Sequence, residues 1–138
     1  MTLKTVGKIL MAATWELPQT LSALLFLAMH KTEPLDRKKR LRYVHHNGFY
    51  TCFSCGEFIF FRASYMRFRS WEDTQKHELG HSIQSRILGP LFIPLIAFPS
   101  TTWNLLSRMN NRLGKWMYRN YYNTPWEHWA DVLGKVKR

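Results

Sequence analysis

The sequence predicts a small α+β domain in which apolar helices flank a short antiparallel hairpin or three-strand meander. At 138 residues the chain is long enough for one hydrophobic core and too short for two ordinary domains. Its composition, 46% hydrophobic and 15% aromatic, excludes a disordered or collagen-like chain. Strand-forming residues gather in 41–61, and helix start and stop signals recur after residue 70. We therefore expect one domain, with an apolar helix in residues 1–31 and a core in residues 41–138.

The N-terminal stretch 9–29 is apolar and follows a basic start, a pattern that is typical of signal peptides. However, no small-x-small cleavage motif precedes His30. The charge-free run 17–29 is shorter than the roughly 20 residues that a bilayer-spanning helix needs. We therefore expect a helix that is buried or lies in a membrane interface. A second apolar run, 87–99, contains three prolines, which prevent a continuous spanning helix.

Residues 32–40 are expected to form a linker before the strands. The stretch 41–61 is rich in Tyr, Val, Phe and Ile, which favour strands, and Asn47-Gly48 suits a tight hairpin turn. A second turn is expected at Ser54-Cys55-Gly56, which leaves 57–61 as a short aromatic strand. We expect this strand either to present a sheet edge to an extended peptide or to be an ordinary core strand.

Three helices are expected in the C-terminal half of the chain. Ser70 is a suitable N-cap for the first helix, with Asp73 at the third position of a capping box. Gly89 and the proline after it end this helix, since glycine accepts a left-handed conformation and proline cannot continue a helix. The second helix is expected over 100–118, and the third over 124–134, where proline occupies the first helical position.

The chain is strongly basic, and its 20 Lys and Arg against nine Asp and Glu give a formal net charge of +11. Four basic residues recur at helical spacing beside the apolar side of the 100–118 helix: Arg108, Arg112, Lys115 and Arg119. Such a helix suits an anionic membrane surface. Nucleic acid is not the expected partner, because no nucleic-acid-binding motif accompanies the charge.

A basic cluster at 37–42 follows the N-terminal apolar segment and would hold that side in the cytoplasm if the segment inserted. We therefore expect a membrane-associated protein on the cytoplasmic face. The alternative is a soluble cytoplasmic protein in which the charged stretch is a solvated linker.

The strongest chemical signal is His77-Glu78-Leu79-Gly80-His81, an H-E-x-x-H pattern within the first of these helices. Histidines four residues apart lie one turn apart on the same helix face, so both imidazoles can bind a single Zn²⁺. Glu78 lies between them and can reach a water molecule on that ion. The sequence therefore predicts a zinc site on this helix.

Catalytic zinc takes three protein ligands, so another ligand must come from elsewhere. The only carboxylate or imidazole side chains after His81 are Glu127, His128 and Asp131. Glu127 and Asp131 share a helix face, so one can bind zinc while the other accepts a hydrogen bond from a ligand histidine. Alternatively, Glu127 forms a capping box with Thr124 and bonds back to its amide. We favour Glu127 as the third ligand, with Asp131 as the second choice.

Two segments of the chain carry a resemblance to a known family. They are residues 77–81 and residues 123–134, and the second contains a W-A-D motif. The chain resembles the gluzincin metallopeptidases of the CAAX-prenyl-protease and HtpX type, and also small bacterial proteins with an H-E-x-G-H helix and a W-A-D motif. The resemblance covers the two motif helices. It implies a zincin-like core in which Glu127 is the third zinc ligand, Asp131 supports a ligand histidine and Glu78 is the catalytic base.

The expected function is peptide-bond hydrolysis, with Zn²⁺ as cofactor and a peptide or protein as substrate. Zinc lowers the pKa of its bound water toward about 7, and Glu78 takes the water proton and returns it to the leaving amine. A donor for the developing oxyanion is expected from His128, Tyr121 or Tyr122. The alternative is a non-catalytic zinc-stabilised protein, in which a fourth protein group closes the metal site and the basic surface binds a membrane or nucleic acid.

Cys52 and Cys55 form a lone C-x-x-C pair. A structural zinc site here would need ligands from elsewhere, such as His45 or His46 across the expected hairpin. A redox role is less favoured, because the reactive motif normally opens a helix. We expect the two cysteines to be small core residues.

Overall fold

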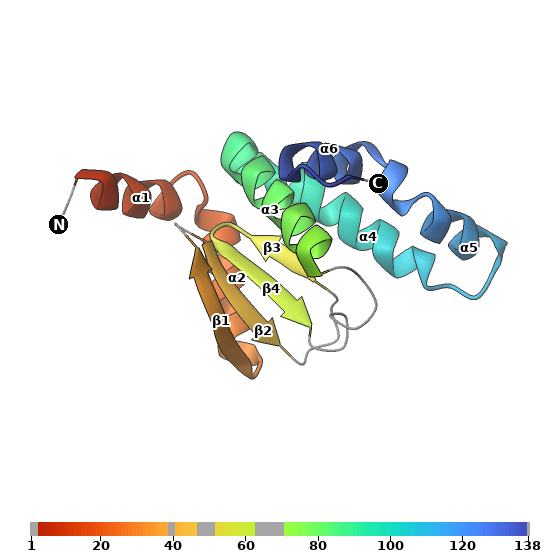
Figure 1. Cartoon of the computed structure of the whole chain (residues 1–138), viewed down its shortest axis with the longest axis horizontal. Coiled ribbons are helices and arrows are strands. Elements are labelled where there is room, and N and C mark those ends of the chain that lie inside the picture. The colour runs from red at the N-terminus through yellow and green to blue at the C-terminus, as the bar shows by residue number, and fades with distance from the viewer. Residues whose placement is uncertain (1–2, 39–40, 47–51, 63–70, 138) are drawn as a thin grey trace.

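The computed structural model describes residues 3–38, 41–46, 52–62 and 71–137 and shows a small α+β domain. Two N-terminal helices are followed by a four-stranded sheet and then by the C-terminal helices (Figure 1). The expected turn at Asn47-Gly48 and the expected helix cap Ser70 lie outside the described residues.

The N-terminal apolar segment forms two helices, α1 (Leu3–Ala13) and α2 (Leu17–Met29), where the sequence predicts one. Pro18 explains the new start, because proline lacks an amide hydrogen and is favoured in the first turn of a helix. Ala23 and Phe26 of α2 are buried in the core, so this segment is an integral part of the domain.

By length and hydropathy, no single helix among the described residues can cross a bilayer. Two pairs of helices pass the same test together, but both pairs are sharply bent. The bend is 85° between 5–13 and 17–29, and 120° between 71–91 and 93–107.

The sheet contains β1 (Thr32–Lys38), β2 (Leu41–His46), β3 (Phe53–Cys55) and β4 (Phe58–Arg62), in the spatial order β1-β2-β4-β3. The expected linker at 32–40 is therefore wrong, since most of it pairs with β2 as an antiparallel strand. The expected antiparallel meander is only partly right. β3 and β4 form an antiparallel hairpin through Gly56, whose φ of +60° suits the turn, but β2 pairs with β4 in parallel.

The aromatic strand β4 lies inside the sheet, between β2 and β3. The prediction that residues 57–61 present a sheet edge is therefore wrong, and the alternative of a core strand is confirmed. Phe58 to Phe61 are all buried, because both faces of β4 are covered. The edge strand on this side is β3.

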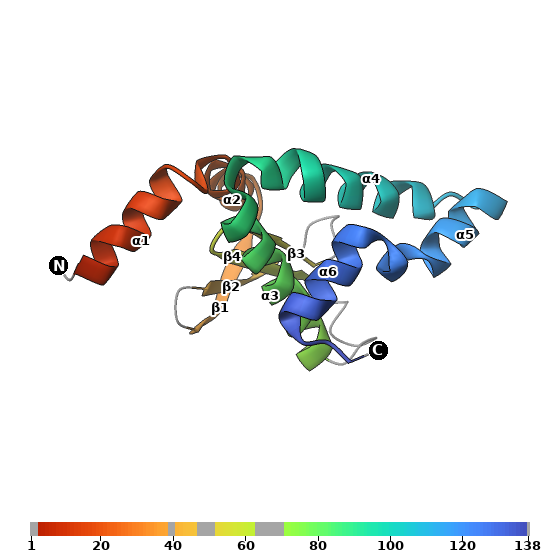
Figure 2. The same cartoon turned by 90° about the horizontal axis from the view of Figure 1, so that it is seen from above.

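Side chains alternate along β4 and build two core clusters on opposite faces of the sheet. Phe58 and Phe60 pack with Phe26 of α2, whereas Ile59 and Phe61 pack with Trp71 and Leu79 of α3. Figure 2 shows the sheet between α2 and α3. The core thus has three layers, with the helix that carries the H-E-x-x-H motif as one of them.

Helix α3 (Trp71–Leu88) confirms the expected helix, and it ends at Gly89, whose φ is +54°. A short 3₁₀ turn, η2 (Gly89–Leu91), and a π turn, η3 (Ile93–Ala97), then connect it to the next helix. Prolines at 90, 94 and 99 remove backbone donors, which explains the irregular hydrogen bonding of this segment.

The single helix expected over 100–118 is wrong, because the chain forms α4 (Phe98–Ser107) and α5 (Arg112–Arg119) instead. Asn111 starts α5, with its side-chain oxygen accepting a hydrogen bond from the Gly114 amide at 2.7 Å. The expected continuous basic stripe is therefore divided: Arg108 caps α4, whereas Arg112, Lys115 and Arg119 lie on α5.

A short turn, η4 (Tyr121–Asn123), leads into α6 (Pro125–Gly134), as the sequence predicts for this helix. Two glycines let α6 cross α3 closely. A Cβ atom on Gly80 would lie 1.9 Å from the carbonyl oxygen of Ala130, and one on Gly134 would lie 1.9 Å from that of Lys76. The backbones therefore touch at both points, which brings side chains of α6 within reach of the two histidines.

Candidate metal centre

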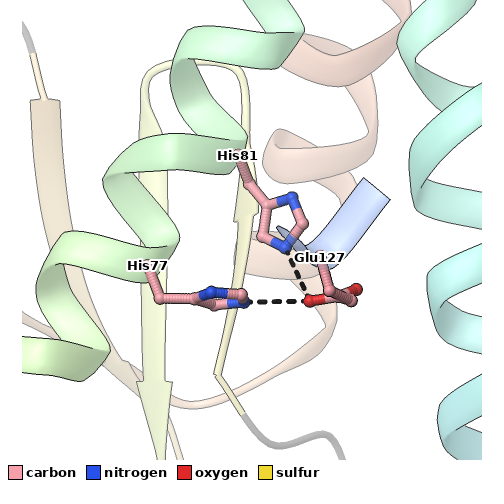
Figure 3. A group of neighbouring side chains, drawn as sticks. All are labelled: His77, His81 and Glu127. Carbon is pink, nitrogen blue, oxygen red and sulfur yellow. Dashed lines mark hydrogen bonds and ion pairs between the residues drawn. The ribbon is translucent and has the colours of Figure 1, made fainter. Parts of the chain in front are cut away.

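Three predicted ligands meet between α3 and α6. His77 and His81 project from successive turns of α3 toward Glu127 of α6 (Figure 3). Oε2 of Glu127 lies 3.0 Å from Nε2 of His77 and 3.3 Å from Nε2 of His81. One potential ligand atom from each residue lies within 4.8 Å of the other two, and all three side chains are buried.

The two separations from Glu127 to the histidines suit a tetrahedral ion. With zinc–ligand distances of 2.0–2.1 Å, neighbouring ligand atoms in a tetrahedral site are about 3.3 Å apart. Both contacts to Glu127 are close to that separation. In the part of the chain that the structure describes, no fourth His, Cys, Asp or Glu joins the group. The three residues therefore suit a metal ion that retains an open coordination position.

The second nitrogen of each histidine is held by a buried acceptor. Nδ1 of His77 lies 2.7 Å from Oδ1 of Asp131, and Nδ1 of His81 lies 2.7 Å from Oε1 of Gln84. Gln84 is itself fixed, because its amide donates to the carbonyl of Trp126 at 2.8 Å. With Nδ1 as the donor in both rings, Nε2 presents its lone pair toward Glu127. Asp131 thus supports His77 from behind and is not in the ligand group.

The capping-box alternative for Glu127 is wrong. The amide of Thr124 donates to the carbonyl of Tyr121 at 3.2 Å, and the Thr124 side chain makes no capping hydrogen bond. The carboxylate of Glu127 is instead held by α4, because the Ser100 hydroxyl donates to its Oε1 at 2.5 Å. This bond leaves Oε2 facing the histidines.

Burial and hydrogen bonding act in opposite directions on the charges of this cluster. Burial would lower the pKa of His77, but its hydrogen bonds to Asp131 and Glu127 outweigh that effect and raise the pKa to about 9. Burial would likewise raise the pKa of Glu127, but hydrogen bonds from His77 and His81 lower it. Without an ion, protons therefore occupy the positions at which a metal would bind.

Glu78 lies beside this cluster without joining it. Its side chain is buried, and its Oε2 has no hydrogen-bond partner among the described residues. Burial raises the pKa of Glu78, although the neighbouring histidines oppose the shift. A buried carboxylate oxygen that lacks a partner is costly unless it has a function or a bound water. Ser54 lies close enough to oppose the pKa shift as well, and Oε2 of Glu78 is the oxygen that can act as the acceptor of a general base.

A cavity of about 360 Å³ adjoins the cluster, and His77, Glu78 and His81 all line it. Phe53 to Cys55 of the edge strand β3 form part of its wall, as does the segment that contains Phe92 and Ile96. The cavity walls are largely apolar, and Tyr121 adds a phenol group. A ligand in this cavity can therefore reach both the metal-binding group and Glu78.

The three residues expected to supply an oxyanion donor have different positions. Tyr121 lines the cavity, and its hydroxyl lies 3.0 Å from the Ser100 hydroxyl. Tyr122 packs edge-on against the ring of His77, with centroids 5.5 Å apart. His128 is exposed and does not line the cavity. Of the three, Tyr121 is the one that lines the cavity, and its role as an oxyanion donor stays a prediction.

Two residues of the site were missed from the sequence. Gln84 follows His81 by three residues and so lies on the same helix face, a spacing that could have identified it. Ser100 offers no such signal, because it reaches Glu127 from α4 after an irregular segment.

Cys52 and Cys55 are half-buried, reduced thiols that line the same cavity. Burial, with a smaller contribution from Glu16, raises the pKa of Cys55 to about 12, so its thiol stays protonated at neutral pH. The side chains of His45 and His46 lie outside the described set, so the alternative zinc site that uses them stays a prediction.

Comparison of the chain with models of known protein families, with curated proteins and with solved structures gives no match. The chemistry of the site is therefore inferred from its own residues.

Proposed function

We propose that the protein is a zinc-dependent metallopeptidase, in which His77, His81 and Glu127 bind the ion and Glu78 is the general base. The observation that carries this proposal is the unpartnered Oε2 of Glu78, which is buried beside two histidines that line the same cavity. A purely structural zinc site is closed by four protein ligands and has no need of an adjacent free carboxylate.

The residues of this site suit the hydrolysis of an amide. Zinc supplies, when bound, a Lewis acid for the scissile carbonyl and a lowered pKa for water. Glu78 accepts the proton of the attacking water and returns it to the leaving nitrogen, and its raised pKa favours that return. The pKa of Tyr121 is raised by burial and by the charge of Glu127, so its phenol keeps its proton and can donate a hydrogen bond to the developing oxyanion.

The edge strand β3 supports a peptide as the substrate. It ends the sheet on the side of the cavity, and Phe53, Ser54 and Cys55 contribute to the cavity wall. An extended peptide can pair with the backbone of an edge strand and place a side chain in an adjacent pocket. The scissile bond of such a peptide would lie close to Glu78.

The test combines metal analysis with a peptidase assay on the purified 138-residue chain. Elemental analysis after dialysis should give about one zinc per chain, and the His81→Ala and Glu127→Ala variants should lose it. Glu78→Gln should retain the zinc and reduce kcat/KM on a library of unstructured peptides by about 10²–10⁴-fold. Glu72→Gln is the matched control on α3, because Glu72 is exposed and pairs with Lys76 at the surface.

The alternatives give different results. A protein that binds zinc but shows no hydrolysis that depends on Glu78 would be a zinc-stabilised binding protein. A protein prepared without chelator that contains no metal would contradict the proposal, and its basic, apolar surface would then be the feature to study.

A further inference from the structure

Helix α2 leaves one apolar face uncovered. Four of its leucines are 40–61% exposed: Leu17, Leu21, Leu24 and Leu25. Their spacing places them on one side of the helix, opposite the buried residues Gln19, Ala23 and Phe26. The outward side of α2 is therefore as apolar as its core side.

The segment that contains η2, η3 and α4 has a second such face. Leu95, Phe98 and Leu106 recur at nearly helical spacing and are 39–68% exposed, and Leu91, just before the bend, is 57% exposed. On the opposite side, Phe92 and Ile96 line the cavity beside the metal centre, together with Ser100 and Asn104. One side of this segment thus faces the cavity, and the other presents large apolar side chains to the surroundings.

The two helices that carry these exposed residues, α2 and α4, lie on the same side of the molecule. Figure 2 shows α2 and α4 along one edge, with the sheet, α3 and α6 beneath them. We name this surface the outer apolar face and define it by eight residues: Leu17, Leu21, Leu24, Leu25, Leu91, Leu95, Phe98 and Leu106. A soluble monomer seldom exposes so many large apolar side chains together, and such a patch marks an interaction surface.

We propose that the outer apolar face docks into the interfacial region of an anionic lipid bilayer. Charge complementarity identifies this occupant, because the net charge of +11 attracts anionic headgroups and opposes the approach of a second copy of the chain. An exposed basic residue, Lys31, lies just after α2 at the border of this face. The half-exposed indole of Trp15 at the start of α2 is of the kind that settles at a membrane interface.

The docking face and the metal centre are separate features that share one segment. With the outer apolar face in the bilayer, the cavity lies on the protein side of η3 and α4, and the metal centre lies deeper still. Substitutions on the outer face therefore leave the ligands untouched. Membrane binding and zinc binding can be lost independently, so failure of one proposal is distinguishable from failure of the other.

The test is flotation of the purified 138-residue chain with vesicles of phosphatidylcholine alone or of phosphatidylcholine mixed with phosphatidylglycerol. The wild type should float with the mixed vesicles, and binding should weaken as NaCl rises from about 0.05 to 0.5 M. Leu25→Glu and Phe98→Glu should each weaken partitioning about tenfold, because each places a charge in the apolar contact. Val132→Glu is the matched control, since Val132 is 60% exposed on α6 and the charge change is the same. Its partitioning should change less than twofold.

Circular dichroism and zinc content of the same samples show whether each variant is folded. Wild-type protein that floats with neither kind of vesicle would overturn the proposal. So would equal losses in Leu25→Glu, Phe98→Glu and Val132→Glu, because binding would then depend on net charge alone. A dimer in analytical ultracentrifugation that Leu25→Glu dissociates would also overturn it, since a second copy would then cover the outer apolar face.

Discussion

Nδ1 of His77 lies 2.7 Å from a carboxylate oxygen of Asp131, and the two residues are 54 positions apart in the chain. This contact joins α3 to α6 behind the metal centre. It fixes the orientation of the His77 ring and makes Nε2 a better metal ligand, because a carboxylate acceptor raises the basicity of the imidazole.

Asp131→Ala should weaken zinc affinity about 10–100-fold, because Nδ1 of the buried His77 loses its acceptor and the ring loses its orientation. Asp131→Asn should have a smaller effect, since an amide oxygen can still accept the hydrogen bond. Competition titration with a chromogenic chelator measures both. Equal loss in the two variants would mean that charge, and not orientation, is the contribution of Asp131.

Ser100→Ala should reduce zinc affinity by about tenfold, because Oε1 of Glu127 loses the hydroxyl donor that holds Oε2 toward the histidines. The matched control is Ser107→Ala on the same helix, because the Ser107 hydroxyl donates to the carbonyl of Asn104, away from the metal centre. That variant should bind zinc like the wild type. Unchanged affinity in Ser100→Ala would contradict a positioning role for this residue.

Gly80→Ala should destabilise the protein by about 1–3 kcal/mol or more, because the added Cβ would lie 1.9 Å from the backbone carbonyl of Ala130. The helices must then separate, and zinc binding should fall with stability. Gly7→Ala is the control: a Cβ there meets nothing within 4 Å, and alanine favours the helix by about 1 kcal/mol. Urea unfolding with chelator present measures both, and equal stability of the two variants would contradict the close crossing of α3 and α6.

The metal-free protein should lose stability as the pH rises from 6.5 to about 9. The pKa of His77 is raised from 6.5 to about 9 in the folded state. Its stabilising contribution is therefore complete below pH 6.5 and is lost as the pH rises through about 9. The lowered pKa of Glu127 acts in the opposite sense. Its contribution to stability is present above pH 4.5 and is lost as the pH falls further. We therefore expect maximum stability of the metal-free protein at about pH 5–6.

Zinc should reverse this trend, because protons compete with the ion for the same histidine nitrogens. The stabilisation that zinc provides should grow as the pH rises from 6 toward 9. Thermal unfolding with chelator and with added zinc, at a series of pH values, separates the two effects. In the His77→Gln variant, the stability of the metal-free protein should increase less as the pH falls from about 9 to about 6. An unchanged pH profile in that variant would assign the dependence to other groups.

The amino-acid sequence by itself determined the local features of the protein. The spacing of His77 and His81 places both imidazoles on one helix face, and Gly89 ends that helix as predicted. Pro125 likewise marks the start of the last helix. These features depend on interactions between residues a few positions apart, so sequence patterns suffice to predict them.

The tertiary structure alone decided which residues complete the site. Glu127 could have been bonded to Thr124 or displaced by Asp131 as a ligand, and only the close crossing of α3 and α6 at Gly80 places it against the histidines. The same holds for the edge position of β3 and for the bond from Ser100, which join segments distant in the chain. Contacts of this kind are set by packing across the whole core and leave no periodic signal in the sequence.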